Sequence, residues 1–168
     1  WAYVGLIGLG AGISTDSVST YIATTGVLGL AGAMLPVING KRFGRLSWIM
    51  SGIVLSIIAA LLLRFFLTAP HYIASMALLF FCWPAVLSYL LAVASQMDRS
   101  GRISTTAGVA SSFGLATGPL LASTLLESGS FSKMLELCAM VFLLSFFLLF
   151  KPVRTQDKVV SVVLSSQG

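Results

Sequence analysis

The sequence predicts an all-α protein, a polytopic bundle of helices that crosses a lipid bilayer. Only 9% of its 168 residues are charged, whereas soluble domains carry about 25%. Hydrophobic residues make up 57% of the chain, and its mean hydropathy is +0.99. A soluble domain of this size leaves roughly 30% of its unfolded surface in water, so it could not hide this much apolar side chain. We therefore expect the lipid bilayer to be the solvent.

Charged residues divide the sequence into uncharged runs, and most of these runs are long enough to span a membrane. As a helix, the run 103–126 would be about 36 Å long, against a hydrocarbon core of ~30 Å. Only helices and closed barrels satisfy the backbone in lipid, and no alternating pattern favours a barrel. We expect a short helix at 1–13, the second half of a truncated helix, followed by five membrane spans: 18–38, 46–67, 71–95, 103–126 and 131–150.

Basic residues predict the orientation of these spans, because loops rich in Lys and Arg stay in the cytoplasm. Of the 10 basic residues, one set of alternate loops carries all but Arg64 and Lys133. The sequence therefore predicts a transmembrane domain at 1–150 and a cytoplasmic tail at 151–168. Because the tail contains Pro152 and ends in small polar residues, we expect it to leave the membrane and to be poorly ordered.

The same composition argues against several functional classes. The net charge of +5 is accounted for by topology and anionic lipid headgroups, and no basic patch with interleaved aromatics indicates nucleic acid as a partner. Cys82 and Cys138 lie inside apolar runs, which is typical of small buried hydrophobes. No span holds an acid pair, a metal cluster or a Ser/His/Asp set, so we expect no enzyme, no catalytic residue, no metal and no cofactor.

A short basic turn with Arg42, Gly44 and Arg45 connects the first two full spans. Its Arg-x-Gly-Arg spacing resembles the loop between the second and third helices of each half in the major facilitator superfamily (MFS) of secondary transporters. Lys41 stands where that loop usually has an acid. In the family this loop latches neighbouring helices during the conformational switch. A plain positive anchor that fixes topology explains the same residues equally well.

A second basic turn contains Asp98, Arg99, Gly101 and Arg102, immediately before the span 103–126. It resembles the family's loop before the penultimate helix, which often reads Asp-x-x-Gly-Arg. The resemblance implies that this turn also belongs to the conformational switch.

Gly114, Gly118 and Pro119 lie deeper in the span 103–126 and resemble a Gly-x-x-x-Gly-Pro element of the same family helix. The two glycines share a helix face that lets another backbone approach, and the proline introduces a bend. Static packing is the alternative, since small-residue faces occur in any membrane bundle. Further glycines in 1–13 and 18–38 predict either an outer gate that flexes or tight packing.

The order of spans and turns resembles the second six-helix half of the MFS general substrate transporter fold, with its first helix truncated. This resemblance covers nearly all 168 residues. It implies that the short helix and the first, third and fourth full spans line a central cavity, while the second and fifth support them from outside. The residues we expect to face that cavity are polar or aromatic: Trp1, Tyr3, Thr25, Trp83, Tyr89 and Ser112.

The resemblance implies transport of a small organic solute across a bacterial inner membrane by alternating access. The mechanism would be rocking of this bundle against a homologous amino-terminal half, its expected partner. No ionisable side chain lies centrally in a span, so we expect that half to carry the carboxylate for proton coupling. The alternative is a non-transporting membrane sensor or assembly module on the same helical scaffold.

Overall fold

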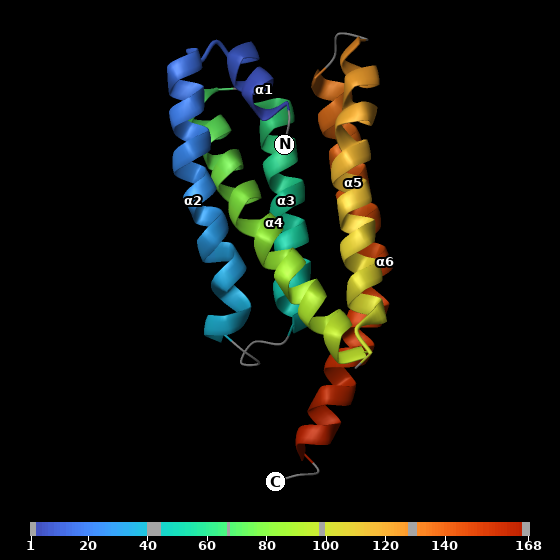
Figure 1. The fold of residues 1–168 in the computed structure, drawn as a ribbon. Helices are drawn as coiled ribbons and strands as arrows, with labels where there is room; N and C mark the ends of the chain where they lie inside the picture. The colour runs from blue at the N-terminus through green and yellow to red at the C-terminus, as the bar shows by residue number, and fades with distance from the viewer. Residues whose placement is uncertain (1–2, 40–44, 67, 98–99, 128–130, 166–168) are drawn as a thin grey trace.

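The computed structural model describes residues 3–39, 45–66, 68–97, 100–127 and 131–165, which form a bundle of helices (Figure 1). No strand occurs in these ranges, and the all-helical prediction is confirmed. A short helix comes first, and five long helices follow it. Their bounds are α1 (Val4–Gly10), α2 (Thr15–Asn39), α3 (Arg45–Phe65), α4 (Ala69–Met97), α5 (Arg102–Glu127) and α6 (Phe131–Ser165).

Helices α2 to α5 match their predicted spans to within three residues, whereas α6 begins at the predicted residue and continues fifteen residues beyond the predicted end. Among the described residues, α2, α3, α4 and α6 are long and apolar enough to cross a membrane. With 26 residues, α5 is also long enough, but Ser, Thr and Gly occupy much of it and lower its hydropathy. By length and composition the described residues therefore contain four candidate spans, one fewer than we predicted, which is compatible with a multi-pass membrane protein.

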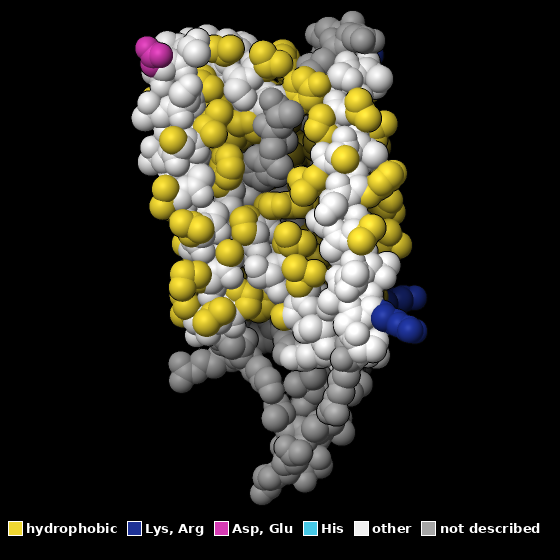
Figure 2. Space-filling view, in the orientation of Figure 1, with side chains coloured by type: hydrophobic (Ala, Val, Ile, Leu, Met, Phe, Trp, Pro, Cys, Tyr) yellow, Lys and Arg dark blue, Asp and Glu magenta, His cyan; other side chains and the backbone are white. Residues whose placement is uncertain are grey.

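The outward faces of these helices expose large apolar side chains, as a lipid solvent requires. The exposed fraction is 80% for Val37, 69% for Leu30 and 66% for Phe147. Figure 2 shows hydrophobic side chains over the length of one face, with its described charged side chains near the ends of the bundle. A soluble protein would keep such apolar surface in smaller patches.

The carboxyl-terminal segment differs from our expectation of a poorly ordered tail. Residues 151–165 continue α6 as a helix through Pro152, and in Figure 1 this end projects beyond the other helices. Pro152 removes one backbone donor, yet its fixed φ is compatible with a helix. Immediately after it, Val153 is buried in a cluster with Ile49 and Met50 of α3. This apolar contact holds the first residue after the proline against α3.

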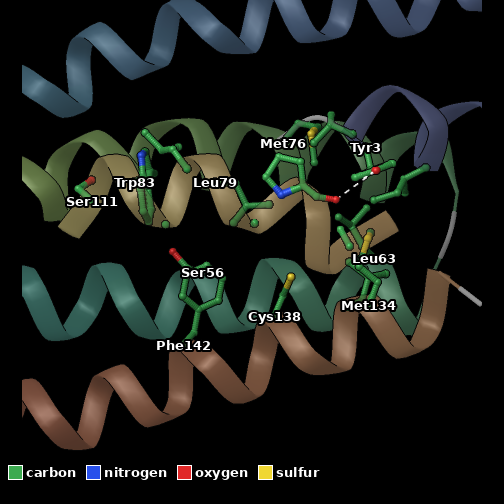
Figure 3. A pocket seen from close by; sticks show the side chains of 18 of the residues that line it. Tyr3, Ser56, Leu63, Met76, Leu79, Trp83, Ser111, Met134, Cys138 and Phe142 are labelled. Carbon is green, nitrogen blue, oxygen red and sulfur yellow. Dashed lines mark hydrogen bonds between the residues drawn. The ribbon is translucent and has the colours of Figure 1, made fainter. Parts of the chain in front are cut away.

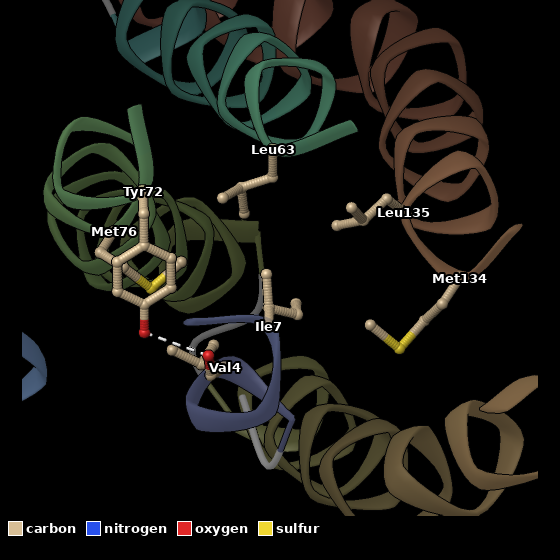
Figure 4. Close-up of a cluster of buried hydrophobic side chains, with 7 residues drawn as sticks. All are labelled: Val4, Ile7, Leu63, Tyr72, Met76, Met134 and Leu135. Atoms are coloured by element: carbon tan, nitrogen blue, oxygen red, sulfur yellow. Dashed lines mark hydrogen bonds between the residues drawn. The ribbon is translucent and has the colours of Figure 1, made fainter. Parts of the chain in front are cut away.

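Helix packing is uneven across the bundle. The most extensive contacts join α2 to α4, α3 to α4 and α3 to α6, whereas α5 contacts α4 and α6 much less. One cluster of buried side chains lies around α1, and Figure 4 shows residues from α1, α3, α4 and α6 converging there. Its best-buried members are Tyr72 and Met76, both fully shielded from solvent. The sparse contacts of α5 leave space beside it.

Glycines bring α2 and α4 into close contact. A Cβ added at Gly29 would lie 3.3 Å from the carbonyl oxygen of Phe80, and one added at Gly32 would overlap the carbonyl oxygen of Phe81. On the same helix, a Cβ at Gly26 would meet nothing within 4 Å. Gly29 and Gly32 therefore allow tight packing against the backbone of α4. Tight packing was one of the two interpretations of these glycines; the other was an outer gate that flexes.

Candidate functional site

A cavity of about 540 Å³ lies beside α5, between that helix and α1, α3, α4 and α6 (Figure 3). Small-molecule sites in proteins are commonly about 300–1,000 Å³, so the volume suits an organic solute. The lining is mostly aliphatic, aromatic or sulfur-containing. Its members are Tyr3, Val4, Ile7, Ser56, Leu63, Met76, Leu79, Trp83, Ala110, Ser111, Gly114, Leu115, Gly118, Pro119, Ala122, Met134, Leu135, Cys138 and Phe142.

Two tyrosine hydroxyls fix the end of the cavity where α1 lies. The Tyr3 hydroxyl donates to the carbonyl oxygen of Pro119 in α5 at 3.3 Å. The Tyr72 hydroxyl, on α4, donates to the carbonyl oxygen of Val4 at 3.1 Å. A neutral hydrogen bond of this kind contributes about 0.5–1.5 kcal/mol. Through these two bonds Tyr3 and the start of α1 connect α5 and α4, which are two of the helices that border the cavity.

The remaining polar groups on the lining differ in whether they are already bonded. Ser56 on α3 is buried and donates to the carbonyl oxygen of Gly52 in its own helix at 2.8 Å. By contrast, within the described chain the Ser111 hydroxyl and the indole N–H of Trp83 have no hydrogen-bond partner. Both residues line the cavity, and Figure 3 shows them at the end away from Tyr3. They are therefore available to a bound molecule.

Of the six residues that we expected to face a cavity, Tyr3 and Trp83 line this one. Thr25 is buried and donates to the carbonyl oxygen of Tyr21 in its own helix at 2.6 Å. Trp1 lies outside the described residues.

Tyr89 and Ser112 are also absent from the lining. Tyr89 is 2% exposed and stacks on Trp48, with 6.1 Å between ring centroids. The Ser112 hydroxyl donates to the carbonyl oxygen of Gly108 at 3.0 Å. Its neighbour Ser111 is the serine on the cavity.

The glycine and proline element of α5 lines the cavity. A Cβ added at Gly114 or Gly118 would meet nothing within 4 Å, so no other part of the described chain packs against this glycine face. Ser111 lies on the same face, three and seven residues before the two glycines. That spacing is the signal by which the sequence could have identified Ser111 in place of Ser112.

The two basic turns are described only in part. Arg42, Gly44, Asp98 and Arg99 lie outside the described residues, and Arg45 is described only by its backbone, at the start of α3. Gly101 has a φ of +78°, a left-handed conformation that L side chains rarely adopt. Its carbonyl oxygen accepts a 2.9 Å bond from the Thr105 amide as α5 begins with Arg102. The glycine of this turn therefore has a structural role.

The cavity draws on different helices from those that the family resemblance implies. Ser56 and Leu63 of α3 and Cys138 and Phe142 of α6 are on its wall, whereas we expected these two helices to be outside supports. No described side chain of α2 lines it. The reason is that α2 packs closely on α4, while α5 stands apart from α3 and leaves α3 and α6 facing the space.

An ion pair that the sequence did not reveal joins α3 to α6. Arg64 Nε lies 2.9 Å from Glu136 Oε1, and the side chains are 30% and 54% exposed. The sequence shows opposite charges near the ends of two predicted spans, which is consistent with an ion pair. It does not show that α3 and α6 are neighbours. The described residues contain no group of three His, Cys, Asp or Glu that could hold a metal ion.

Comparisons of this chain with protein-family models, with curated proteins and with solved structures gave no match.

Proposed function

We propose that this chain is the carboxyl-terminal half of an MFS secondary transporter. In this proposal it moves a small organic solute across a bacterial inner membrane by alternating access, with its carboxyl end in the cytoplasm. A homologous amino-terminal half of the same polypeptide packs against this bundle and supplies the carboxylate for proton coupling. The observation that carries the proposal is the 540 Å³ cavity beside α5, with Tyr3 and Trp83 on its wall.

The features around the cavity suit a helix that moves. The glycine face of α5 borders open space, so it can shift without displacing packed side chains. Pro119 in α5 and Pro84 in α4 each remove one backbone hydrogen bond, which lowers the cost of bending. When one bundle rocks against another, the helices near the central site must be able to shift and bend.

Native Cys138 provides a test, because it is exposed and lines the cavity, whereas Cys82 is buried. The full polypeptide would be placed in right-side-out and inside-out membrane vesicles and treated with a membrane-impermeant methanethiosulfonate reagent carrying a sulfonate. Mass spectrometry of the Cys138 peptide then reports access from each side. Alternating access predicts modification from both sides.

A matched control uses Phe147→Cys, also on α6 and 66% exposed, but absent from the cavity lining. We expect this cysteine to face lipid and to stay unmodified from either side, because the reagent needs a hydrated thiolate. If Cys138 were modified from one side only, or not at all, the transport proposal would fail and a sensor or assembly module would be favoured.

A further inference from the structure

The lining of the cavity carries no formal charge. Among the described residues that form its wall there is no Asp, Glu, Lys, Arg or His. The nearby ion pair of Arg64 and Glu136 is already satisfied by its own 2.9 Å contact. A charged solute would lose hydration on entry without gaining a partner, and an unpaired buried charge is strongly unfavourable. The wall contributed by this chain therefore selects against ions.

The available hydrogen-bonding groups gather at one end. Trp83 presents an indole N–H, which can only donate, and Ser111 presents a hydroxyl, which can donate or accept. Neither group has a hydrogen-bond partner in the described chain. At the other end the Tyr3 hydroxyl proton is already committed to the Pro119 carbonyl oxygen. A solute with an acceptor atom near Trp83 would satisfy the donor that the protein leaves unpaired.

The space between these ends suits an apolar body. Leu79 and Met76 lie along α4 between Trp83 and Tyr3 in Figure 3, and Met134 faces the same space from α6. Methionine side chains are flexible and polarisable, so they adapt to aromatic or branched shapes. The dimensions and lining thus favour a molecule that is apolar for most of its length.

We infer that the cavity binds an uncharged, mainly apolar organic molecule that carries a hydrogen-bond acceptor, such as an amide or ketone carbonyl, at its Trp83 and Ser111 end. This inference rests on the proposed function and names the chemical class of its solute. It assigns Trp83 and Ser111 to orientation of the solute, and Leu79 and Met134 to contact with its apolar part.

The test uses three probes with one aromatic framework and different charge: naphthalene-2-carboxamide, naphthalene-2-carboxylate and 2-naphthylmethylammonium. The full polypeptide in lipid nanodiscs is treated with N-ethylmaleimide at increasing probe concentration, and the modification rate of Cys138 is followed by mass spectrometry. We expect the carboxamide to protect Cys138 at a concentration at least about tenfold lower than either ion, because both ions must be desolvated without a partner. Equal protection by the carboxylate or the ammonium, or no protection by the carboxamide, would overturn the inference.

Variants test the orienting groups. Trp83→Phe and Ser111→Ala should each raise the protective concentration of the carboxamide by about two- to tenfold, the equivalent of one lost hydrogen bond. Ser112→Ala is the matched control, since Ser112 is adjacent but bonds to its own helix and is absent from the lining. Undiminished protection in both cavity variants, or an equal loss in the control, would refute the assignment.

The two proposals fail in different ways. Modification of Cys138 from one side of the vesicles only, together with selective protection by the carboxamide, would reject transport and keep the ligand class. Modification from both sides, together with protection by the carboxylate, would keep transport and reject the ligand class. A Cys138 that reacts in neither vesicle orientation nor in nanodiscs would show that protein fills the space, and would overturn both.

Discussion

Replacement of Gly32 by alanine tests the close approach of α2 to α4. The added Cβ would overlap the carbonyl oxygen of Phe81, which is backbone and cannot rotate away as a side chain could. To accommodate it, α2 must move outward along the interface that forms the most extensive contact in the bundle. We therefore expect Gly32→Ala to destabilise the protein.

The magnitude follows from two opposing effects. Overpacking of a tight interface costs about 1–3 kcal/mol, whereas alanine in place of glycine favours the helix by up to ~1 kcal/mol. Because the overlap is with backbone atoms, we take the upper part of the overpacking range, about 2–3 kcal/mol, so the net loss in the free energy of unfolding is about 1–2 kcal/mol. For a unit of 150–250 residues this corresponds to a decrease of about 2–8 °C in apparent Tm.

The assay is thermal unfolding of the purified full polypeptide in detergent, followed by size-exclusion chromatography with fluorescence detection. Gly26→Ala is the matched control, because its Cβ would meet nothing within 4 Å on the same helix. Gly29→Ala, with a 3.3 Å contact to Phe80, should fall between them. An apparent Tm for Gly32→Ala at or above that of Gly26→Ala would refute the contact between α2 and α4.

Three other substitutions test the remaining parts of the bundle. Glu136→Gln, which breaks the partly exposed pair with Arg64, should lower stability by less than about 1 kcal/mol, with an apparent Tm difference that shrinks at high salt; a larger, salt-independent loss would contradict this. Tyr72→Phe removes a buried 3.1 Å bond and should cost about 0.5–1.5 kcal/mol in the same assay, whereas no change in Tm would show that the bond contributes nothing. Gly114→Leu should abolish carboxamide binding with Tm preserved, while Gly108→Leu, equally open but outside the lining, should retain it; loss in both would argue against the cavity.

The helices were predictable from sequence because the bilayer imposes a simple rule. Each backbone amide in lipid must bond within its own segment, and charged residues must leave the hydrocarbon. The charged turns therefore fix the helix ends, and the ends of α4 and α5 agree with the sequence to within about two residues. The same rule failed beyond Pro152, because burial of Val153 against α3 is a tertiary contact. Local polarity alone could not predict it.

The cavity was less predictable, because its wall depends on which helices pack together. The aromatic residues Trp83 and Tyr89 are six apart on α4 and were equal candidates from the sequence. Only the fold decides between them, since α3 covers Tyr89 by stacking Trp48 on it and leaves Trp83 facing the space beside α5. For the same reason Ser111 could not be distinguished from Ser112 without using the glycine face as a guide.

The composition that leaves α5 out of the four candidate spans also makes the cavity. Replacement of large apolar side chains by Ser, Thr and Gly lowers its hydropathy and removes the side chains that would have filled the space next to α3. Contacts of α5 with α4 and α6 are few, so a shift of α5 breaks fewer apolar contacts than a shift of α3 would. One hydrogen bond, from Tyr3 to the Pro119 carbonyl oxygen, holds α5 to the segment before α1. Because such a bond contributes only about 0.5–1.5 kcal/mol, a ligand that favoured the shifted position of α5 by more than this amount would offset the loss of the bond.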